Sequence, residues 1–178
     1  MDHGVTEYMP MNIRIAGVVN DSIVDGPGLR FAVFTQGCSH HCPGCHNPET
    51  HDPQGGHDED TETLIARMKK NPLLSGVTLS GGDPLEQSAP CLELAKAAHG
   101  MGLNVWAYTG YTWEQLLERD DPDQMALLRE LDVLVDGPFI QAQRSLELDY
   151  CGSKNQRLIA VPDSLREGRV VLWTPPVW

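Results

Sequence analysis

The sequence predicts an α/β protein whose core is an open, partial β/α barrel of parallel strands. Short apolar segments alternate along the chain with helix-length segments of mixed polar and apolar residues. Nearly all-apolar strands in such an alternation are typical of parallel strands covered by helices. The chain has 178 residues, whereas a full eight-fold barrel takes about 250. We therefore expect a single domain over residues 1–178, with loose tails at 1–12 and 174–178.

The predicted strands are short, largely apolar and bounded by turn-forming residues. β-Branched or aromatic side chains dominate the first two, and the third ends at a pair of glycines. The next two follow predicted helices and are apolar at their centres. In chain order we place strands at residues 13–19, 29–36, 76–80, 103–108 and 132–136, with further candidates at 157–161 and 169–173.

The predicted helices lie between these strands and show helical periodicity and start signals. Leu64, Ile65 and Met68 fall on one face of the first helix. Pro90 suits the first turn of the second, which is rich in Ala and Leu and is followed by glycines. We expect helices at residues 60–70, 87–99, 112–119 and 123–131, and a loose segment at 51–59.

The charge balance excludes two classes of partner. Lys and Arg number 13 against 25 for Asp and Glu, which gives a formal net charge of -12. Binding to nucleic acid or to an anionic membrane surface needs clustered basic residues, so we expect neither. No stretch approaches the length of a membrane span, and residues 1–11 contain no apolar segment of a signal peptide. We therefore expect a cytoplasmic protein.

The candidate functional residues follow the ends of the predicted strands. A cysteine-rich loop follows the second strand, and Gly81-Gly82 ends the third. Thr109-Gly110 and Asp136-Gly137 follow the next two. Ligands of parallel α/β sheets bind at the carboxyl ends of the strands, so we expect these turns to face one mouth.

The cysteine loop has the spacing of a metal site. Cys38-x3-Cys42-x2-Cys45 is flanked by glycines and a proline that allow a loop to wrap around a group. Three thiolates can hold an iron–sulfur cubane in which one iron lacks a protein ligand. A zinc site stays open as an alternative, with a histidine as fourth ligand: His40, His41, His46 or His51. Cys91 lies in a helical pattern and is expected to be buried, and Cys151 adjoins a turn with no assigned role.

Several motifs in order carry a family resemblance. They are DGPGLR (25–30), the cysteine loop with its suffix CHNPET (45–50), SGGDP (80–84), VWAYTGYTWEQL (105–116), LDVLVDGPFI (131–140) and GSKNQR (152–157). Together they resemble the glycyl-radical-enzyme activases of the radical S-adenosylmethionine (SAM) superfamily. Within that group the chain is most similar to the activating proteins of anaerobic (class III) ribonucleoside-triphosphate reductase. The resemblance covers about residues 13–160 and implies the partial barrel of the radical SAM type.

The resemblance implies a radical mechanism. Cys38, Cys42 and Cys45 would ligate one [4Fe-4S] cluster, and the remaining iron would bind the amine and carboxylate of SAM. One electron delivered to the cluster would cleave SAM to methionine and a 5′-deoxyadenosyl radical. That radical would remove hydrogen from a backbone glycine of the large reductase subunit. A low-potential donor such as flavodoxin would supply the electron.

The resemblance also implies residue roles. SAM would contact two groups of residues, one around the last cysteine and one at the strand ends: Gly44 and His46, and Ser80, Gly81, Gly82, Asp83, Thr109 and Asp136. The turn of Asp25, Gly26, Pro27 and Gly28 would position the substrate glycine loop. His40 and His41 are interpreted as exposed loop residues. Two other hypotheses remain, namely an activase of another glycyl-radical enzyme and a zinc-stabilised interaction module.

Overall fold

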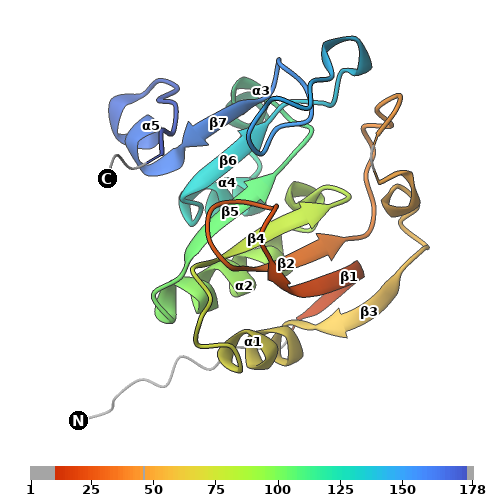
Figure 1. The fold of residues 1–178 in the computed structure, drawn as a ribbon, viewed down its shortest axis with the longest axis vertical. Coiled ribbons are helices and arrows are strands. Elements are labelled where there is room, and N and C mark those ends of the chain that lie inside the picture. Colours follow the sequence, from red (N-terminus) through yellow and green to blue (C-terminus); the bar gives the residue numbers. More distant parts are fainter. Residues whose placement is uncertain (1–10, 46, 176–178) are drawn as a thin grey trace.

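The protein is described by a computed structural model at residues 11–45 and 47–175. Its centre is a seven-stranded sheet with the order β3-β1-β2-β4-β5-β6-β7 (Figure 1). The strands are β1 (Asn12–Ser22), β2 (Arg30–Thr35), β3 (His57–Asp60), β4 (Gly76–Gly81), β5 (Asn104–Tyr108), β6 (Val133–Asp136) and β7 (Arg157–Ala160). This order leaves two edges, so the sheet is open, and β3 and β7 do not pair with each other.

The middle of the sheet is parallel, as expected, whereas both flanks are antiparallel. Strands β2, β4, β5 and β6 pair in parallel in that order. Strand β1 pairs antiparallel with both β2 and β3, and β7 pairs antiparallel with β6. The expectation of a wholly parallel sheet is therefore wrong at its flanks. The mixed α/β class and the parallel core are confirmed.

Three predicted segments need correction. The expected loose segment 51–59 contains the start of β3, which pairs with β1 from Asn12↔Asp60 to Ile15↔His57. The predicted strand at 157–161 ends one residue earlier, because Val161 begins a helix. The candidate strand at 169–173 makes only the isolated bridge Ile159↔Leu172. Most residues of the two predicted loose tails lie outside the described part of the chain.

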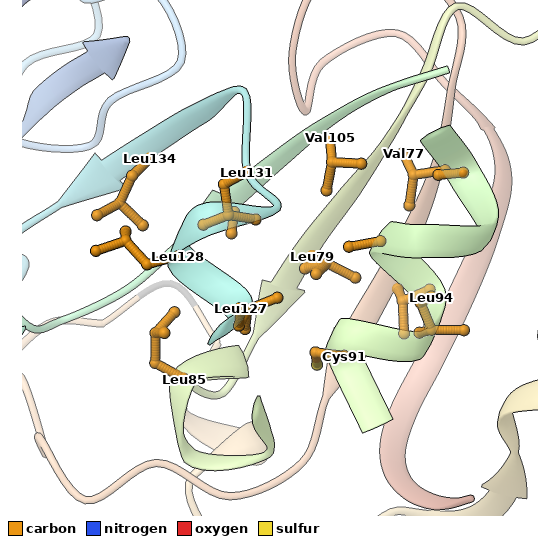
Figure 2. Close-up of a cluster of buried hydrophobic side chains, with 14 of the residues drawn as sticks. Val77, Leu79, Leu85, Cys91, Leu94, Val105, Leu127, Leu128, Leu131 and Leu134 are labelled. Carbon is orange, nitrogen blue, oxygen red and sulfur yellow. The ribbon is translucent and has the colours of Figure 1, made fainter. Parts of the chain in front are cut away.

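The helices pack on one face of the sheet and form the main core with it. They are α1 (Thr61–Lys69), α2 (Ser88–Gly100), α3 (Trp113–Arg119), α4 (Pro122–Arg129) and α5 (Val161–Glu167). Figure 2 shows side chains of β4, β5 and β6 meeting those of α2 and α4: Val77, Leu79, Cys91, Leu94, Val105, Leu127, Leu128 and Leu134, all fully buried. Cys91 is therefore a core residue, as expected. None of the described helices is long and apolar enough to cross a membrane.

The opposite face of the sheet carries a buried cation. Arg30, at the start of β2, has no exposed surface, and its guanidinium lies 5.5 Å from the ring centroid of Trp106. It donates to the carbonyl oxygens of Pro27 and Val77, at 3.0 Å each, and to Thr78 Oγ1 at 2.7 Å. Burial lowers the pKa of Arg30 to about 10. This arginine fastens the turn before β2 to the sheet.

A histidine near the end of α2 links this helix to the segment that precedes β6, at the amino-terminal ends of the parallel strands. His99 Nδ1 lies 3.0 Å from Glu130 Oε2, and its Nε2 lies 2.9 Å from Asp132 Oδ2. Partial burial lowers the pKa of His99, but the hydrogen bonds to Asp132 and Glu130 outweigh it, so the pKa is raised overall.

This raised pKa predicts a pH dependence of stability. The stabilising contribution of protonated His99 is complete below the pKa of an unfolded histidine, about 6.5. It is lost as the pH rises through the higher pKa of the folded state. We expect the free energy of unfolding of the wild type, relative to His99→Gln, to fall as the pH rises from about 6 towards 8. Urea unfolding across this range measures it, and parallel curves for the two proteins would contradict it.

Candidate functional site

A cavity of about 410 Å³ opens at the carboxyl ends of the parallel strands. All three cysteines of the predicted metal loop line it. Residues from each of the four predicted turns also line it, and the wall includes Asp25, Ser80, Gly81, Gly82, Thr109, Gly110, Gly137, Tyr150, Cys151 and Gln156. The expectation that these turns face one mouth is therefore confirmed.

The cysteine loop follows β2 (orange in Figure 1) and is closed at its base by hydrogen bonds. Gly37 N donates to Thr50 O at 2.7 Å, and Cys38 N donates to His51 O at 3.1 Å. The side-chain amide of Gln36 donates to two carbonyl oxygens of the segment that follows the loop, those of Glu49 and Asp52, at 2.8 and 2.7 Å. The two ends of the loop are thus held together without any contribution from the cysteine side chains.

The three thiols of the loop lie where they could hold an iron–sulfur cluster. Cys38, Cys42 and Cys45 are free, half-buried and in one cavity wall. Burial raises the pKa of Cys38 to about 11. Across the described residues, which exclude His46, no three His, Cys, Asp or Glu side chains are gathered around a single-ion position. A cubane takes each thiolate on a different iron, so its ligands surround a volume instead of a point. Three thiols in one cavity wall fit a [4Fe-4S] cluster in which one iron lacks a protein ligand.

The glycine turn after β4 allows two strand ends to approach each other closely. Gly81 has φ +94°, and a Cβ there would lie 2.4 Å from the backbone nitrogen of Thr35. A Cβ on Gly82 would lie 2.3 Å from the carbonyl oxygen of Gly37. Gly82 N donates to Thr35 O at 2.7 Å, and Asp83 N donates to Gly37 O at 2.9 Å. Only glycine permits this contact, which fixes the turn against the start of the cysteine loop.

Asp83 is completely buried and is absent from the described cavity wall. Its Oδ1 accepts from Leu85 N at 3.0 Å, which caps the short 3₁₀ helix Pro84–Glu86. Its Oδ2 accepts from Thr109 Oγ1 at 2.9 Å, from Gly110 N at 3.0 Å and from His40 Nε2 at 2.6 Å. The carboxylate that was expected to contact SAM is instead surrounded by protein donors.

His40 corrects an expectation of the sequence analysis. Its side chain is only 16% exposed, because it reaches inward to Asp83 and its ring meets the edge of Tyr111 with a centroid distance of 4.6 Å. The hydrogen bond to Asp83 raises the pKa of His40 despite its burial. His41, in contrast, is exposed as expected. The sequence offered no signal that distinguishes the two adjacent histidines.

Thr109 and Asp136 follow neighbouring strands, but only Thr109 lines the cavity. Asp136 is 1% exposed and accepts from Trp113 N at 2.8 Å. Arg157 donates to both of its oxygens, Nε to Oδ1 at 3.1 Å and Nη2 to Oδ2 at 2.6 Å. The hydrogen bonds to Asp136 and Glu114 raise the pKa of Arg157 further. The partner arginine was missed because it lies 21 residues farther along the chain, at the start of another predicted strand.

The turn before β2 places one of its four predicted residues in the cavity. Asp25 lines the wall, whereas Gly26, Pro27 and Gly28 do not. Thr78 Oγ1 donates to the carbonyl oxygen of Asp25 at 2.7 Å. Together with the Arg30 contact described above, this bond holds the turn on the sheet.

Of the two residues beside Cys45 that were predicted to contact SAM, Gly44 and His46, the structure describes only Gly44. Gly44 has φ +73° and packs against Gln141, whose Cδ would lie 2.9 Å from a Cβ at this position. It does not line the cavity. His46 lies outside the described residues, so its predicted contact with SAM stays a prediction.

The segment that follows Cys151 supports the cavity wall. Asn155 donates to Pro138 O at 2.8 Å, and Gln156 donates to Gly137 O at 3.0 Å. Gln156 also accepts from Gly152 N at 2.9 Å. The GSKNQR motif therefore holds the loop after β6, and Cys151 lines the same cavity as the three loop cysteines.

Comparisons with known proteins agree with this geometry. A family model described as a 4Fe-4S single cluster domain matches residues 24–159. A protein of Vibrio cholerae named anaerobic ribonucleoside-triphosphate reductase-activating protein is 39% identical over 142 residues, covering 75% of this chain and 89% of that protein. Proteins of the same name from Escherichia coli K12 and Enterobacteria phage T4 are 37% and 32% identical and cover 75% and 80% of this chain, and 90% of each relative is matched.

A solved structure, that of QueE from Escherichia coli, matches 57% of this chain and 53% of its own with a TM-score of 0.46 and 16% identity. At this level the similarity does not establish a common fold. The family match and the curated relatives each extend over most of the chain. The chain therefore belongs to the family of anaerobic ribonucleoside-triphosphate reductase-activating proteins.

Proposed function

We propose that this protein activates an anaerobic ribonucleoside-triphosphate reductase by reductive cleavage of SAM at a [4Fe-4S] cluster held by Cys38, Cys42 and Cys45. The observation that carries the proposal is that the three thiols share one cavity with the Gly81-Gly82 turn. Backbone hydrogen bonds hold that turn against the base of the cysteine loop. The names of the curated relatives support the reductase as the protein that is activated.

When bound, the cluster supplies one electron that breaks a sulfonium carbon–sulfur bond of SAM. The chain itself binds, orients and shields the reactants. We place SAM against Ser80, Gly81, Gly82 and Thr109, because all four line the cavity beside the cysteines. Gly44 and His46 are proposed to lie near its adenosyl part.

The two buried aspartates have a different proposed role. The described contacts surround Asp83 and Asp136 with protein donors. We propose that they orient the loops that contact SAM, instead of accepting its ammonium group directly. Asp25 faces the cavity, and we propose that it positions the glycine-bearing segment of the reductase, with Gly26, Pro27 and Gly28 shaping the turn.

The proposed partners are the large glycyl-radical subunit and a low-potential electron donor such as flavodoxin. The net charge of -12 supports a protein substrate over nucleic acid or an anionic membrane surface. A cytoplasmic location is part of the same proposal. Activation of another glycyl-radical enzyme would use the same residues and differ only in the partner.

Anaerobic reconstitution tests the proposal. The loaded protein should contain iron and sulfide in cubane proportion, and SAM should change the EPR spectrum of the reduced cluster. With a reductant it should release 5′-deoxyadenosine and generate a radical on the reductase. A reductase with its radical glycine replaced by alanine should acquire none. Absence of 5′-deoxyadenosine both with and without the reductase would refute the proposal, and one zinc without iron would favour the interaction module.

A further inference from the structure

One side chain of the cysteine loop reaches the buried carboxylate that organises the rest of the cavity. Asp83 has four donors, of which Leu85 N, Thr109 Oγ1 and Gly110 N come from the loops after β4 and β5. The fourth is His40 Nε2, from between the first two cysteines. A carboxylate has about four acceptor positions. Three of the donors meet Oδ2 and one meets Oδ1, so losing His40 would remove one of the protein hydrogen bonds that satisfy this buried carboxylate.

We propose that His40 is a positioning residue that aligns the Cys38–Cys42 half of the cysteine loop with the wall that binds SAM. It acts through the hydrogen bond from its Nε2 to Asp83. This inference rests on the proposed function, since it concerns the alignment of the two halves of that site.

The position of the imidazole ring supports this role. A Cβ on Gly110 would lie 2.4 Å from His40 Cδ2, so the ring lies directly against this glycine. Tyr111 meets the ring from another direction. The turn Thr109-Gly110 therefore holds the ring by packing and, through Asp83, by a hydrogen bond. A shift of the ring would move the loop between two cluster ligands.

A second contact of the same loop is weaker. Ser39 N lies 3.3 and 3.2 Å from the two carboxylate oxygens of Glu86, Ser39 Oγ also donates to Glu86 Oε1, and this pair is exposed to solvent. Exposed charged contacts contribute little, whereas a buried, charge-assisted hydrogen bond contributes more. We therefore assign the alignment to His40 and not to Ser39.

Two substitutions of His40 separate the hydrogen bond from the mere presence of a polar side chain. The side-chain amide nitrogen of Gln reaches about as far as Nε2, and that of Asn ends near the position of Nδ1. His40→Asn should therefore break the bond to Asp83, and His40→Gln should restore it. His41→Asn is the matched control, because His41 is exposed and has φ +50°, a conformation that Asn tolerates.

In reconstituted, reduced protein we expect His40→Asn to weaken SAM binding by about 10-fold to 100-fold, as for other residues that orient a metal site. The SAM-induced change in the EPR spectrum should shrink in parallel, at equal iron content. His40→Gln and His41→Asn should both match the wild type. Wild-type SAM affinity and EPR response in His40→Asn would overturn the inference, and so would failure of His40→Gln to restore them.

A measurement on the unaltered chain covers the case in which the substituted proteins do not fold. Nitrogen-15 NMR of histidines in the full-length, cluster-free protein should show His40 with its proton on Nε2 and slow exchange with water. An Nε2 without a proton would overturn the inference. If SAM leaves the EPR spectrum of the wild type unchanged, the proposed function fails, while the NMR result still decides the contact between His40 and Asp83.

Discussion

Replacing any one of Cys38, Cys42 and Cys45 by Ser is expected to abolish assembly of the cluster. A cubane without one thiolate leaves two of its irons without a protein ligand, and a serine hydroxyl is a poor substitute for a soft thiolate. SAM cleavage should fall by at least about 10³-fold, since groups that act as a unit lose their function together. Iron and sulfide analysis after anaerobic reconstitution, followed by quantification of 5′-deoxyadenosine, measures both effects.

The remaining two cysteines provide two controls. Cys91 tests the effect of a cysteine in the core, and Cys151 tests whether the cavity supplies a fourth ligand. Cys91 is fully buried in the core, so Cys91→Ala should lower the free energy of unfolding by about 1 kcal/mol and leave the iron content unchanged. Cys151 lines the cavity beside the loop cysteines. Cys151→Ser should also retain the full cluster. Loss of iron in that variant would mean that the chain supplies a fourth ligand, and three-cysteine ligation would be wrong.

Gly81→Ala and Gly82→Ala are each expected to reduce the free energy of unfolding by about 3 kcal/mol or more. A methyl group at either position would lie 2.3–2.4 Å from backbone atoms of the chain around Thr35 and Gly37. Backbone cannot rotate out of the way as a side chain can, so β2 and β4 would have to separate at their carboxyl ends. Gly81 adds the strain of φ +94°, which costs about 1–2 kcal/mol for a residue with a side chain. Equilibrium unfolding in urea measures the change.

Gly102→Ala is the matched control for this effect. Gly102 has a similar φ of +77°, but a Cβ there would have no neighbour within 4 Å. It should therefore lose only about 1–2 kcal/mol from backbone strain. If Gly81→Ala destabilises the protein no more than Gly102→Ala does, the close approach of the two strand ends does not contribute to stability.

The parallel core could be predicted because its strands have a clear pattern. Strands β2, β4, β5 and β6 are apolar and alternate with helices, and this pattern also predicts which turns meet at one edge. The flanking strand β3 has the sequence HDED and is mostly exposed, so it carries no apolar signal. Its pairing with β1 depends on backbone hydrogen bonds at the sheet edge, which side-chain composition does not reveal.

The candidate site shows a similar division. The motifs predicted which loops form the cavity, and Cys38, Gly81 and Thr109 all line it. The direction of each side chain was not predictable, because it depends on partners far along the chain. Asp136 turns away to Arg157, and Asp83 turns inward to His40. In both cases a carboxylate that follows a strand accepts hydrogen bonds from the protein itself.

The hydrogen bonds at the base of the cysteine loop make the fold of the loop's ends independent of a bound cluster. Gly37 and Cys38 are joined to Thr50 and His51 by the backbone alone, and Gln36 reinforces the junction. Closing a loop costs conformational entropy, and in this fold hydrogen bonds of the protein close the loop without a metal. Loss of a cluster is therefore expected to disturb mainly the residues between these bonds. Without iron, the two ends of the cysteine loop are therefore expected to stay at the same separation, so that a cluster can be inserted again.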